Sequence, residues 1–273
     1  PQNRSAHHTM TSPDVIIIGS GIGGATLAAT IAATGKRILI LERGEHLAPS
    51  AQDRSDKAIF ADGFFRPKEE WLDGEGKPFN PGNYYYVGGN SKFYGAVLLR
   101  YRREDFAPLA HMGGVTPGWP ISYDDLEPSY ALAEKMYEVR GQIGQDPTEP
   151  PHSTQYTHPP VPDEPPIAAL RRRLTKVGLH PSPLPLGVDL AKWLARARTP
   201  WDAFPDTTGG KMDAETAALK KALLHDNVQL RTKAQVTRLR SGAEGRITGV
   251  ELASGEVLSA PIVVLAAGAI QTA

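Results

Sequence analysis

The segment from Asp14 to Gly24, DVIIIGSGIGG, constrains the fold of this chain more than any other segment. Its apolar run predicts a short buried strand, and the glycines after it predict a tight turn that opens a helix of small residues. Gly19 permits the turn, Gly21 leaves room for a pyrophosphate beside the backbone, and Gly24 lets the helix lie close to the sheet. Phosphates would bind the free N–H groups at the N-terminus of that helix.

A second predicted strand, residues 37–41, ends at an acid, Glu42. A carboxylate at this spacing can accept hydrogen bonds from both ribose hydroxyls of an adenosine, and its charge would repel the extra phosphate of NADP. Strand, glycine turn, helix, strand and acid together predict an α/β fold that binds a dinucleotide, either FAD or NAD. A glycine turn in an ordinary α/β protein is the alternative interpretation.

The composition of the 273 residues excludes several classes of function. Lysine plus arginine and aspartate plus glutamate both number 30, so neither a nucleic-acid partner nor a membrane-surface partner is expected. The longest apolar stretch is interrupted by glycines, which argues against a membrane span. The absence of cysteine excludes disulfides, thiolate metal sites and cysteine nucleophiles. Residues 1–12 are polar and are expected to form a flexible tail, and the cytoplasm is the default compartment.

A second glycine-rich element, residues 87–96, reads VGGNSKFYGA. It follows an irregular stretch, residues 43–83, which is long for a connection inside a compact domain. Long structured loops of this kind are usually functional. Taken alone, however, the element is equally well explained as a loop with ordinary turn glycines.

The middle of the chain predicts helices separated by a proline-rich linker. One helix is expected to begin at Ser122 and to run towards residue 139, and another to cover 167–178. Between them, prolines crowd residues 147–166, which predicts extended chain. His152 and His158 of this linker are interpreted as solvent-exposed loop histidines, and no metal site is predicted.

The last third predicts regular structure again. Asp213 can cap a helix through Leu224, and a hairpin turn is expected around residues 242–245. Residues 261–269 read as a buried strand that runs into small residues, with no helix after it to cover it. The other three predicted strands are residues 228–231, 234–239 and 247–252.

Four of these elements occur in the order found in the glucose–methanol–choline (GMC) family of FAD-dependent oxidoreductases, which this chain resembles from Asp14 onward. The first glycine turn with Glu42 resembles the family's ADP-binding motif, and the second glycine element resembles the segment that wraps the flavin and pyrophosphate. Residues 264–270, VLAAGAI, are similar to a later signature where backbone passes FAD. Residues 119–128, WPISYDDLEP, resemble the start of a cap helix.

The resemblance implies a Rossmann-like FAD-binding domain over residues 13–110 and 210–273. Residues 111–209 would form a partial substrate-cap domain, mostly helix and loop. Val236 would offer its backbone to the adenine, although it reads equally well as a plain inward-facing strand residue. The residues that the resemblance places against FAD are Gly19, Gly21, Ile22, Gly24, Glu42, Arg43, Gly88, Gly89, Asn90, Ser91, Tyr94, Gly95, Ala96, Val236, Ala267 and Gly268.

Two departures from the family pattern carry further expectations. Phe93 stands where many members carry a histidine that bonds covalently to the flavin, so non-covalent FAD is expected. The family's catalytic histidine and its partner histidine or asparagine lie well beyond the position of Gly268. No catalytic residue is therefore assigned within this chain.

The implied activity is oxidation of an alcohol or sugar hydroxyl by hydride transfer to flavin N5. The catalytic pair and most of the substrate domain would come from a C-terminal segment or from a second polypeptide. Two readings of the sequence, a separate partner chain and a fragment of one longer chain, remain open. A catalytically inactive flavin-binding module and an NAD-dependent dehydrogenase are the alternatives from other classes.

Overall fold

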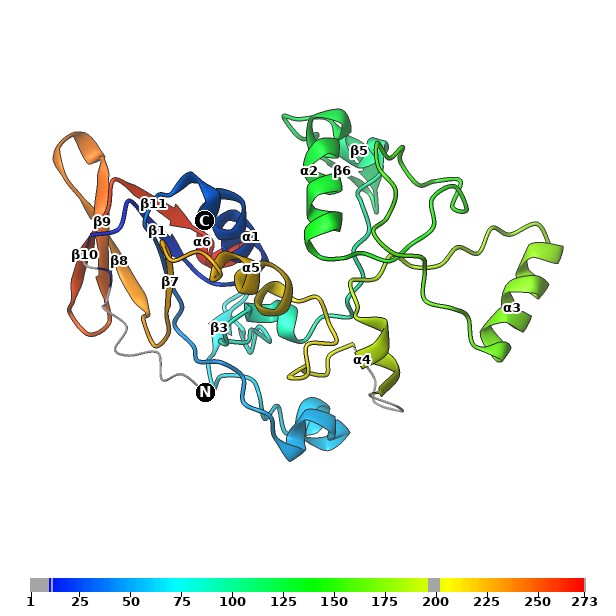
Figure 1. Ribbon diagram of the computed structural model, residues 1–273, viewed down its shortest axis with the longest axis horizontal. Coiled ribbons are helices and arrows are strands. Elements are labelled where there is room, and N and C mark those ends of the chain that lie inside the picture. The colour runs from blue at the N-terminus through cyan, green and yellow to red at the C-terminus, as the bar shows by residue number, and fades with distance from the viewer. Residues whose placement is uncertain (1–9, 11, 196–201, 273) are drawn as a thin grey trace. The chain divides into compact units, whose positions relative to one another are not determined.

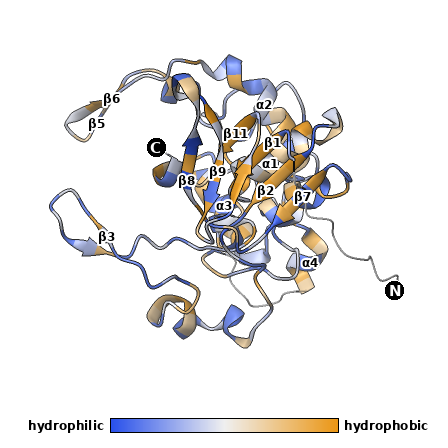
Figure 2. Ribbon diagram, turned by 90° about the vertical axis from the view of Figure 1, so that its left-hand side faces the viewer, coloured by the Kyte–Doolittle hydropathy of each residue, from blue (hydrophilic) through white to orange (hydrophobic). Residues whose placement is uncertain are grey.

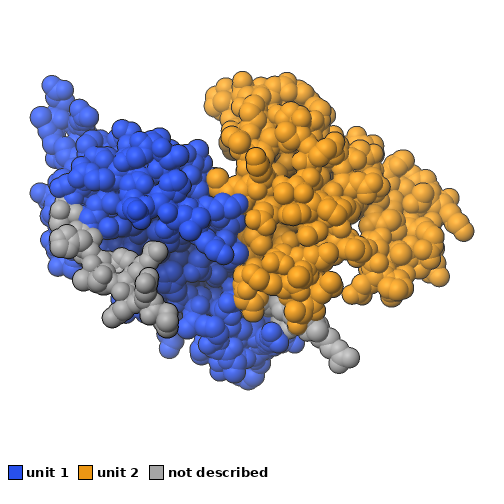
Figure 3. Space-filling view, viewed as in Figure 1, with its two compact units in different colours: residues 1–94, 199–207, 213–273 blue, residues 95–198, 208–212 orange. Residues whose placement is uncertain are grey.

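The computed structural model describes residue 10, residues 12–195 and residues 202–272. Most of the predicted N-terminal tail, residues 1–9 and 11, lies outside the described residues. The chain divides into two compact units, which Figure 3 colours separately. Unit 1 comprises Pro1–Tyr94, Thr199–Thr207 and Asp213–Ala273, and unit 2 comprises Gly95–Arg198 and Thr208–Met212.

The centre of unit 1 is a four-stranded parallel sheet in the order β11-β1-β2-β7 (Figure 1). Its strands are β1 (Val15–Ile18), β2 (Ile38–Leu41), β7 (Val228–Arg231) and β11 (Ile262–Leu265). Ile18 is in register with Leu41 and with Leu265, so the chain leaves three neighbouring strands at one edge. Every residue of β1 and β2 is buried, as expected for parallel strands covered on both faces.

Each face of this sheet packs against a different layer. Helix α1 (Ile22–Ile31) packs against β1, β2 and the short helix η6 (Ala214–Leu219). On the other side, an antiparallel sheet of β8 (Val236–Ser241), β9 (Ile247–Leu252) and β10 (Val257–Ser259) shares one apolar core with β1 and β2. Figure 2 shows β1 and β2 in the colour of strongly hydrophobic residues. That core contains Ile16, Ile18, Leu39, Leu41, Ala234, Val250, Leu252, Leu258 and Ala260.

The regular elements predicted for the last third are present, with shifted bounds. Asp213 caps η6 by accepting a hydrogen bond from the backbone N–H of Thr216 at 2.8 Å, and α5 (Lys220–Ala222) continues the helix. Strand β8 begins at Val236, two residues later than expected, and the turn η7 (Ala243–Gly245) joins it to β9. The expectation that no helix follows the last strand is wrong in one respect, because α6 (Ala269–Thr272) forms a short helical turn.

The shorter elements of unit 1 lie mostly in the loops between these strands. They are η1 (Ala32–Thr34), η2 (Ala51–Arg54), η3 (Lys57–Ala61), η4 (Gly89–Lys92) and the strand pair β3 (Trp71–Leu72) and β4 (Pro78–Phe79).

Unit 2 contains less regular structure. Its elements are η5 (Arg103–Phe106), the hairpin of β5 (Leu109–His111) and β6 (Gly114–Thr116), α2 (Tyr123–Met136), α3 (Pro165–Lys176) and α4 (Leu190–Ala195). Ser122 caps α2 through a reciprocal capping box with Asp125, as the sequence predicts. Helix α3 starts two residues earlier than predicted and buries none of its residues. Among the described residues, no helix has the length and apolar character needed to cross a membrane.

Candidate cofactor site

A cleft of about 860 Å³ opens in unit 1 at the carboxyl ends of β1, β2 and β11. Ligands of open α/β sheets bind at this edge. Its wall is built from the turn between β1 and α1, the end of β2, the second glycine element and the segment after β11. The parallel register places these segments together, because each strand ends at the same level of the sheet.

Most of the residues that the sequence places against a cofactor line this one cleft. Gly24 does not, because it lies one turn into α1, and Tyr94 is half-buried outside the lining. Gly95 and Ala96 belong to unit 2. The predicted residues in the lining are Gly19, Gly21, Ile22, Glu42, Arg43, Gly88, Gly89, Asn90, Ser91, Val236, Ala267 and Gly268.

Gly19 and Gly24 are required by close contacts of the backbone. Gly19 has φ of +102°, and a Cβ there would lie 2.4 Å from the carbonyl oxygen of Ala266. A Cβ on Gly24 would lie 2.0 Å from the carbonyl oxygen of Gly19, which confirms the close packing of α1 that the sequence predicts. Any larger residue at either position would push β1, α1 and the segment after β11 apart.

The N-terminus of α1 presents open space and free donors to the cleft. Gly21 is its N-cap, no side chain caps the helix, and no acidic residue occupies the first turn. A Cβ on Gly21 would meet nothing within 4 Å. The first intrahelical bond runs from the N–H of Ala25 to the carbonyl of Gly21, which leaves the preceding N–H groups at the positive end of the helix. This arrangement fits a pyrophosphate.

Glu42 is buried at the tip of β2 and is held by three donors. Its Oε2 accepts hydrogen bonds from the backbone N–H of Ser20 at 3.0 Å and from Ser20 Oγ at 2.6 Å. Its Oε1 accepts one from the N–H of Gly44 at 2.9 Å. A carboxylate has about four lone-pair sites. As placed, Glu42 therefore retains room on Oε1 for one further donor, such as one ribose hydroxyl.

Aromatic side chains form one wall of the cleft. The guanidinium of Arg43 lies 3.6 Å from the ring centroid of Tyr85, which suits a cation–π contact. Tyr84 lines the cleft and stacks on Phe93 with 3.7 Å between ring centroids and 11° between ring planes. Phe93 itself is buried in an aromatic cluster with Phe65 and Phe204 and does not line the cleft.

Sequence patterns did not point to several residues that build this site. Ser20 is fully buried, and Gly44 is required because a Cβ there would lie 1.9 Å from the carbonyl oxygen of Tyr85. Lys92, inside the second glycine element, is buried and pairs with Asp213 at 3.0 Å and Glu215 at 2.7 Å. For Gly44, the only signal in the sequence was that the residue is a glycine. For Ser20 and Lys92 there was no signal, because their partners lie far from them along the chain.

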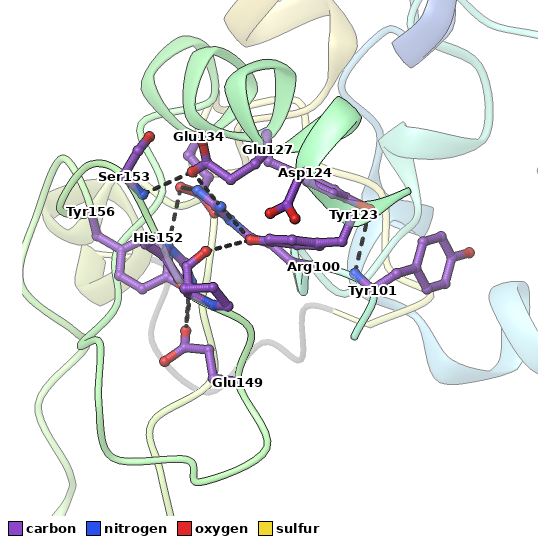
Figure 4. A network of polar contacts seen from close by, with 12 residues as sticks. Arg100, Tyr101, Tyr123, Asp124, Glu127, Glu134, Glu149, His152, Ser153 and Tyr156 are labelled. Carbon is purple, nitrogen blue, oxygen red and sulfur yellow. Dashed lines mark hydrogen bonds and ion pairs between the residues drawn. The ribbon is translucent and has the colours of Figure 1, made fainter. Parts of the chain in front are cut away.

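Unit 2 contains a buried polar network centred on Arg100 (Figure 4). Arg100 binds both carboxylate oxygens of Glu134 at 2.7 Å, and it also contacts Glu127 at 3.0 Å and the hydroxyl of Tyr123 at 2.8 Å. These hydrogen bonds outweigh the effect of burial and raise the pKa of Arg100. The N–H of Ser153 and the guanidinium of Arg100 lower the pKa of Glu127 to about 2.

The prediction that His152 is solvent-exposed is wrong, because its side chain is fully buried in this network. Its Nε2 lies 3.0 Å from Glu149 Oε1 and its Nδ1 lies 3.8 Å from Glu134 Oε2. Burial and the nearby Arg100 charge lower the pKa of His152, so the neutral form is favoured. The structure assigns no helix or strand to residues 149–164 of the proline-rich segment, but its last two predicted residues, Pro165 and Pro166, begin α3. The prolines gave no sign that Ser153 and His152 would contact acids of α2.

Comparisons with known proteins identify the family. The family model described as FAD dependent oxidoreductase matches residues 14–272, so the chain belongs to this family and its cofactor is FAD. The chain is 31% identical to 6'''-hydroxyparomomycin C oxidase of Streptomyces lividus over 95% of this chain and 49% of the relative. It is also 31% identical to paromamine 6'-oxidase of Streptomyces fradiae, over 86% of this chain and 43% of the relative.

A solved structure shows the same fold at lower identity. The crystal structure of pyridoxine 4-oxidase from Mesorbium loti superposes with a TM-score of 0.61 at 19% identity, covering 96% of this chain and 50% of that protein.

A further sequence relative, fructose dehydrogenase large subunit of Gluconobacter japonicus, is 26% identical over 96% of this chain and 53% of the relative. The chain thus spans about half the length of the relatives that it matches.

Proposed function

We propose that this chain is the FAD-binding part of a GMC-type oxidoreductase that oxidises an alcohol or sugar hydroxyl by hydride transfer to flavin N5. The observation that carries the proposal is that two glycine elements, the acid at the end of β2 and the segment after β11 line one cleft. An NAD-dependent dehydrogenase would need only the first glycine element and the acid. The names of the two Streptomyces relatives, 6'''-hydroxyparomomycin C oxidase and paromamine 6'-oxidase, support a sugar-like substrate.

The described residues would divide the binding of FAD among them. Glu42 would accept a ribose hydroxyl, Arg43 and the backbone of Val236 would contact the adenine, and the N-terminus of α1 would hold the pyrophosphate. Residues 88–91 and 267–268 would lie along the flavin half. When bound, FAD supplies the hydride acceptor. The chain's own part is to bind FAD, to orient it and to exclude water from it.

We propose that a base outside this chain takes the proton of the substrate hydroxyl. We assign that role to the catalytic histidine pair of a C-terminal segment or of a second polypeptide, which would also complete the substrate domain. Because the chain spans about half the length of its relatives, either arrangement would supply residues equivalent to the remainder. The cytoplasm stays the predicted compartment.

FAD is proposed to be non-covalent. Phe93 has no nucleophilic atom, and it is 4% exposed beneath the ring of Tyr84. Denaturing the yellow protein and filtering it should therefore release all of the flavin. Flavin that stays with the unfolded polypeptide would overturn this part of the proposal.

The activity is tested by adding alcohols and sugars, aminosugars included, to the natural protein that contains this chain, in the absence of oxygen. Bleaching of the visible absorbance of oxidised flavin, at a rate that depends on substrate concentration, is the expected result. A stably yellow protein that no hydroxyl compound bleaches would favour the inactive module. A colourless protein with nicotinamide-dependent turnover would favour the NAD-linked dehydrogenase.

A further inference from the structure

We infer that Ser20 is a positioning residue that couples the adenosine end of the cleft to its flavin end. It does this by holding Glu42 and Gly88 at a fixed separation. The inference rests on FAD occupying the cleft as proposed above. It concerns a residue that faces away from the cofactor and that no part of the proposed chemistry requires.

Ser20 is fully buried, and its hydroxyl both donates and accepts a hydrogen bond. Its side chain is buried, and although Gly19 and Gly21 on either side line the cleft, Ser20 does not. Ser20 Oγ donates to Glu42 Oε2 at 2.6 Å and accepts from the backbone N–H of Gly88 at 3.1 Å. Its hydroxyl is therefore used in both directions inside the protein, and it has no contact with the cleft.

The segment that Ser20 holds is also tied from its other side. The carbonyl of Gly88 accepts a hydrogen bond from Ser91 Oγ at 2.6 Å, and Ser91 Oγ accepts one from the N–H of Ala214 at 3.0 Å. Gly88 has φ of +92°, a conformation that its two flanking bonds keep in place. We call the series Gly44, Glu42, Ser20, Gly88, Ser91 and Ala214 the Ser20 relay. It runs from the end of β2 to the start of η6.

Removing the hydroxyl breaks the Ser20 relay at its centre. The N–H of Gly88 would be left buried without this partner, and a buried unpaired donor is costly. Glu42 would keep the backbone N–H groups of Ser20 and Gly44, so its own position would change less. Ligands that reach only the adenosine end should therefore be insensitive to Ser20, whereas FAD, which spans both ends, should be sensitive.

The test compares FAD with ADP, which is the adenosine half of the cofactor, on the apoprotein of the natural flavoprotein. For Ser20→Ala we expect the Kd of FAD to rise about tenfold, which corresponds to the loss of one buried hydrogen bond. The Kd of ADP should change by less than about threefold. Ser20→Cys replaces the hydroxyl by a somewhat larger group that is a weak donor and a weak acceptor. Its FAD affinity should fall between those of the wild type and Ser20→Ala.

The matched control is Thr30→Val, which removes a hydroxyl bonded to the carbonyl of Thr26 at 2.8 Å on the exposed side of α1. It should change neither the Kd of FAD nor the Kd of ADP.

Two results in Ser20→Ala would overturn the inference: an equal rise in the Kd of FAD and of ADP, or an unchanged Kd of FAD. If Ser20→Ala does not fold, the same comparison of the two Kd values in Ser20→Cys decides. Failure of the proposed function is a separate result. In that case the wild type binds FAD but no alcohol or sugar bleaches it.

Discussion

The central sheet of unit 1 and the Arg100 network of unit 2 are stabilised by different kinds of interior. In unit 1, β1 and β2 are entirely apolar and buried, and the ion pairs of buried Lys92 with Asp213 and Glu215 lie outside this sheet. In unit 2, the interior contains Arg100 with its partners Glu134, Tyr123 and Glu127, and α3 has no buried residue. Apolar burial is insensitive to pH and to single charges, whereas a buried ion network depends on every member. The central sheet of unit 1 and the Arg100 network of unit 2 should therefore be sensitive to different substitutions.

The largest effect is expected at Arg100. Arg100→Met would leave Glu134 buried without its bidentate partner, and breaking a buried pair in this way costs about 3–5 kcal/mol. Chemical denaturation followed by circular dichroism should show that the free energy of unfolding falls by this amount. Protection of α2 amides against hydrogen exchange should fall, and that of β1 amides should not.

Arg103→Met is the matched control. Arg103 also binds both oxygens of an α2 acid, Asp124, but the Arg103 and Asp124 side chains are 48% and 66% exposed. Solvent screens this pair, so no resolvable change in the transition is expected. If the two variants destabilise the protein equally, burial of the network is not what stabilises unit 2.

In unit 1 we expect sensitivity at Gly19, where the backbone of neighbouring segments leaves no room for a side chain. Gly19→Ala would force a residue with a side chain into φ of +102° and bring its Cβ within 2.4 Å of Ala266 O. The conformational penalty alone is about 1–2 kcal/mol. We expect loss of FAD together with a lower melting temperature, measured by flavin absorbance and by differential scanning fluorimetry.

Gly35→Ala separates the two causes of that penalty. Gly35 has a φ of +73°, yet a Cβ there would meet nothing within 4 Å. It should show only the conformational cost of about 1 kcal/mol and should keep its FAD. Equal flavin loss in both glycine variants would contradict the role given to the close contact at Gly19.

This contrast also explains what the sequence could and could not predict. The strands of unit 1 follow from local apolar runs, and Gly19, Glu42 and Gly88 follow from the spacing of a known cofactor motif. The network around Arg100 could not be predicted, because Glu134 and His152 lie far from Arg100 in sequence and have no characteristic spacing. The same holds for Ser20, whose role depends on Gly88 in a separate loop.

A smaller effect is expected from the titration of His152. Its folded pKa lies below the ordinary 6.5, because burial and Arg100 outweigh the nearby Glu134 and Glu149, with Tyr156 also packed against the ring. Neutral His152 therefore contributes fully to the free energy of unfolding above pH 6.5, and this contribution is lost as pH falls. The free energy of unfolding should decline by at most about 1.4 kcal/mol per pH unit from this group.

Stability measured from pH 7 to pH 5 (roughly the range in which histidine titrates) should decline in the wild type and decline less in His152→Gln. Glu127, with its pKa lowered to about 2 from 4.5, adds its own loss only at lower pH, so the two steps separate. An unchanged slope in His152→Gln would show that another group titrates in this window.

The smallest effect is expected on α3. Leu170 is 50% exposed on a helix with no buried residue, so Leu170→Ser should change the free energy of unfolding by less than about 0.5 kcal/mol. Leu39→Ala is its counterpart in unit 1, where the side chain is 1% exposed within the shared core and truncation should cost about 2–5 kcal/mol. A large loss in Leu170→Ser, measured on the natural protein, would mean that a segment outside the described residues covers α3. Unit 2 would then bury apolar surface against that segment, and the contrast between its Arg100 network and the central sheet of unit 1 would narrow.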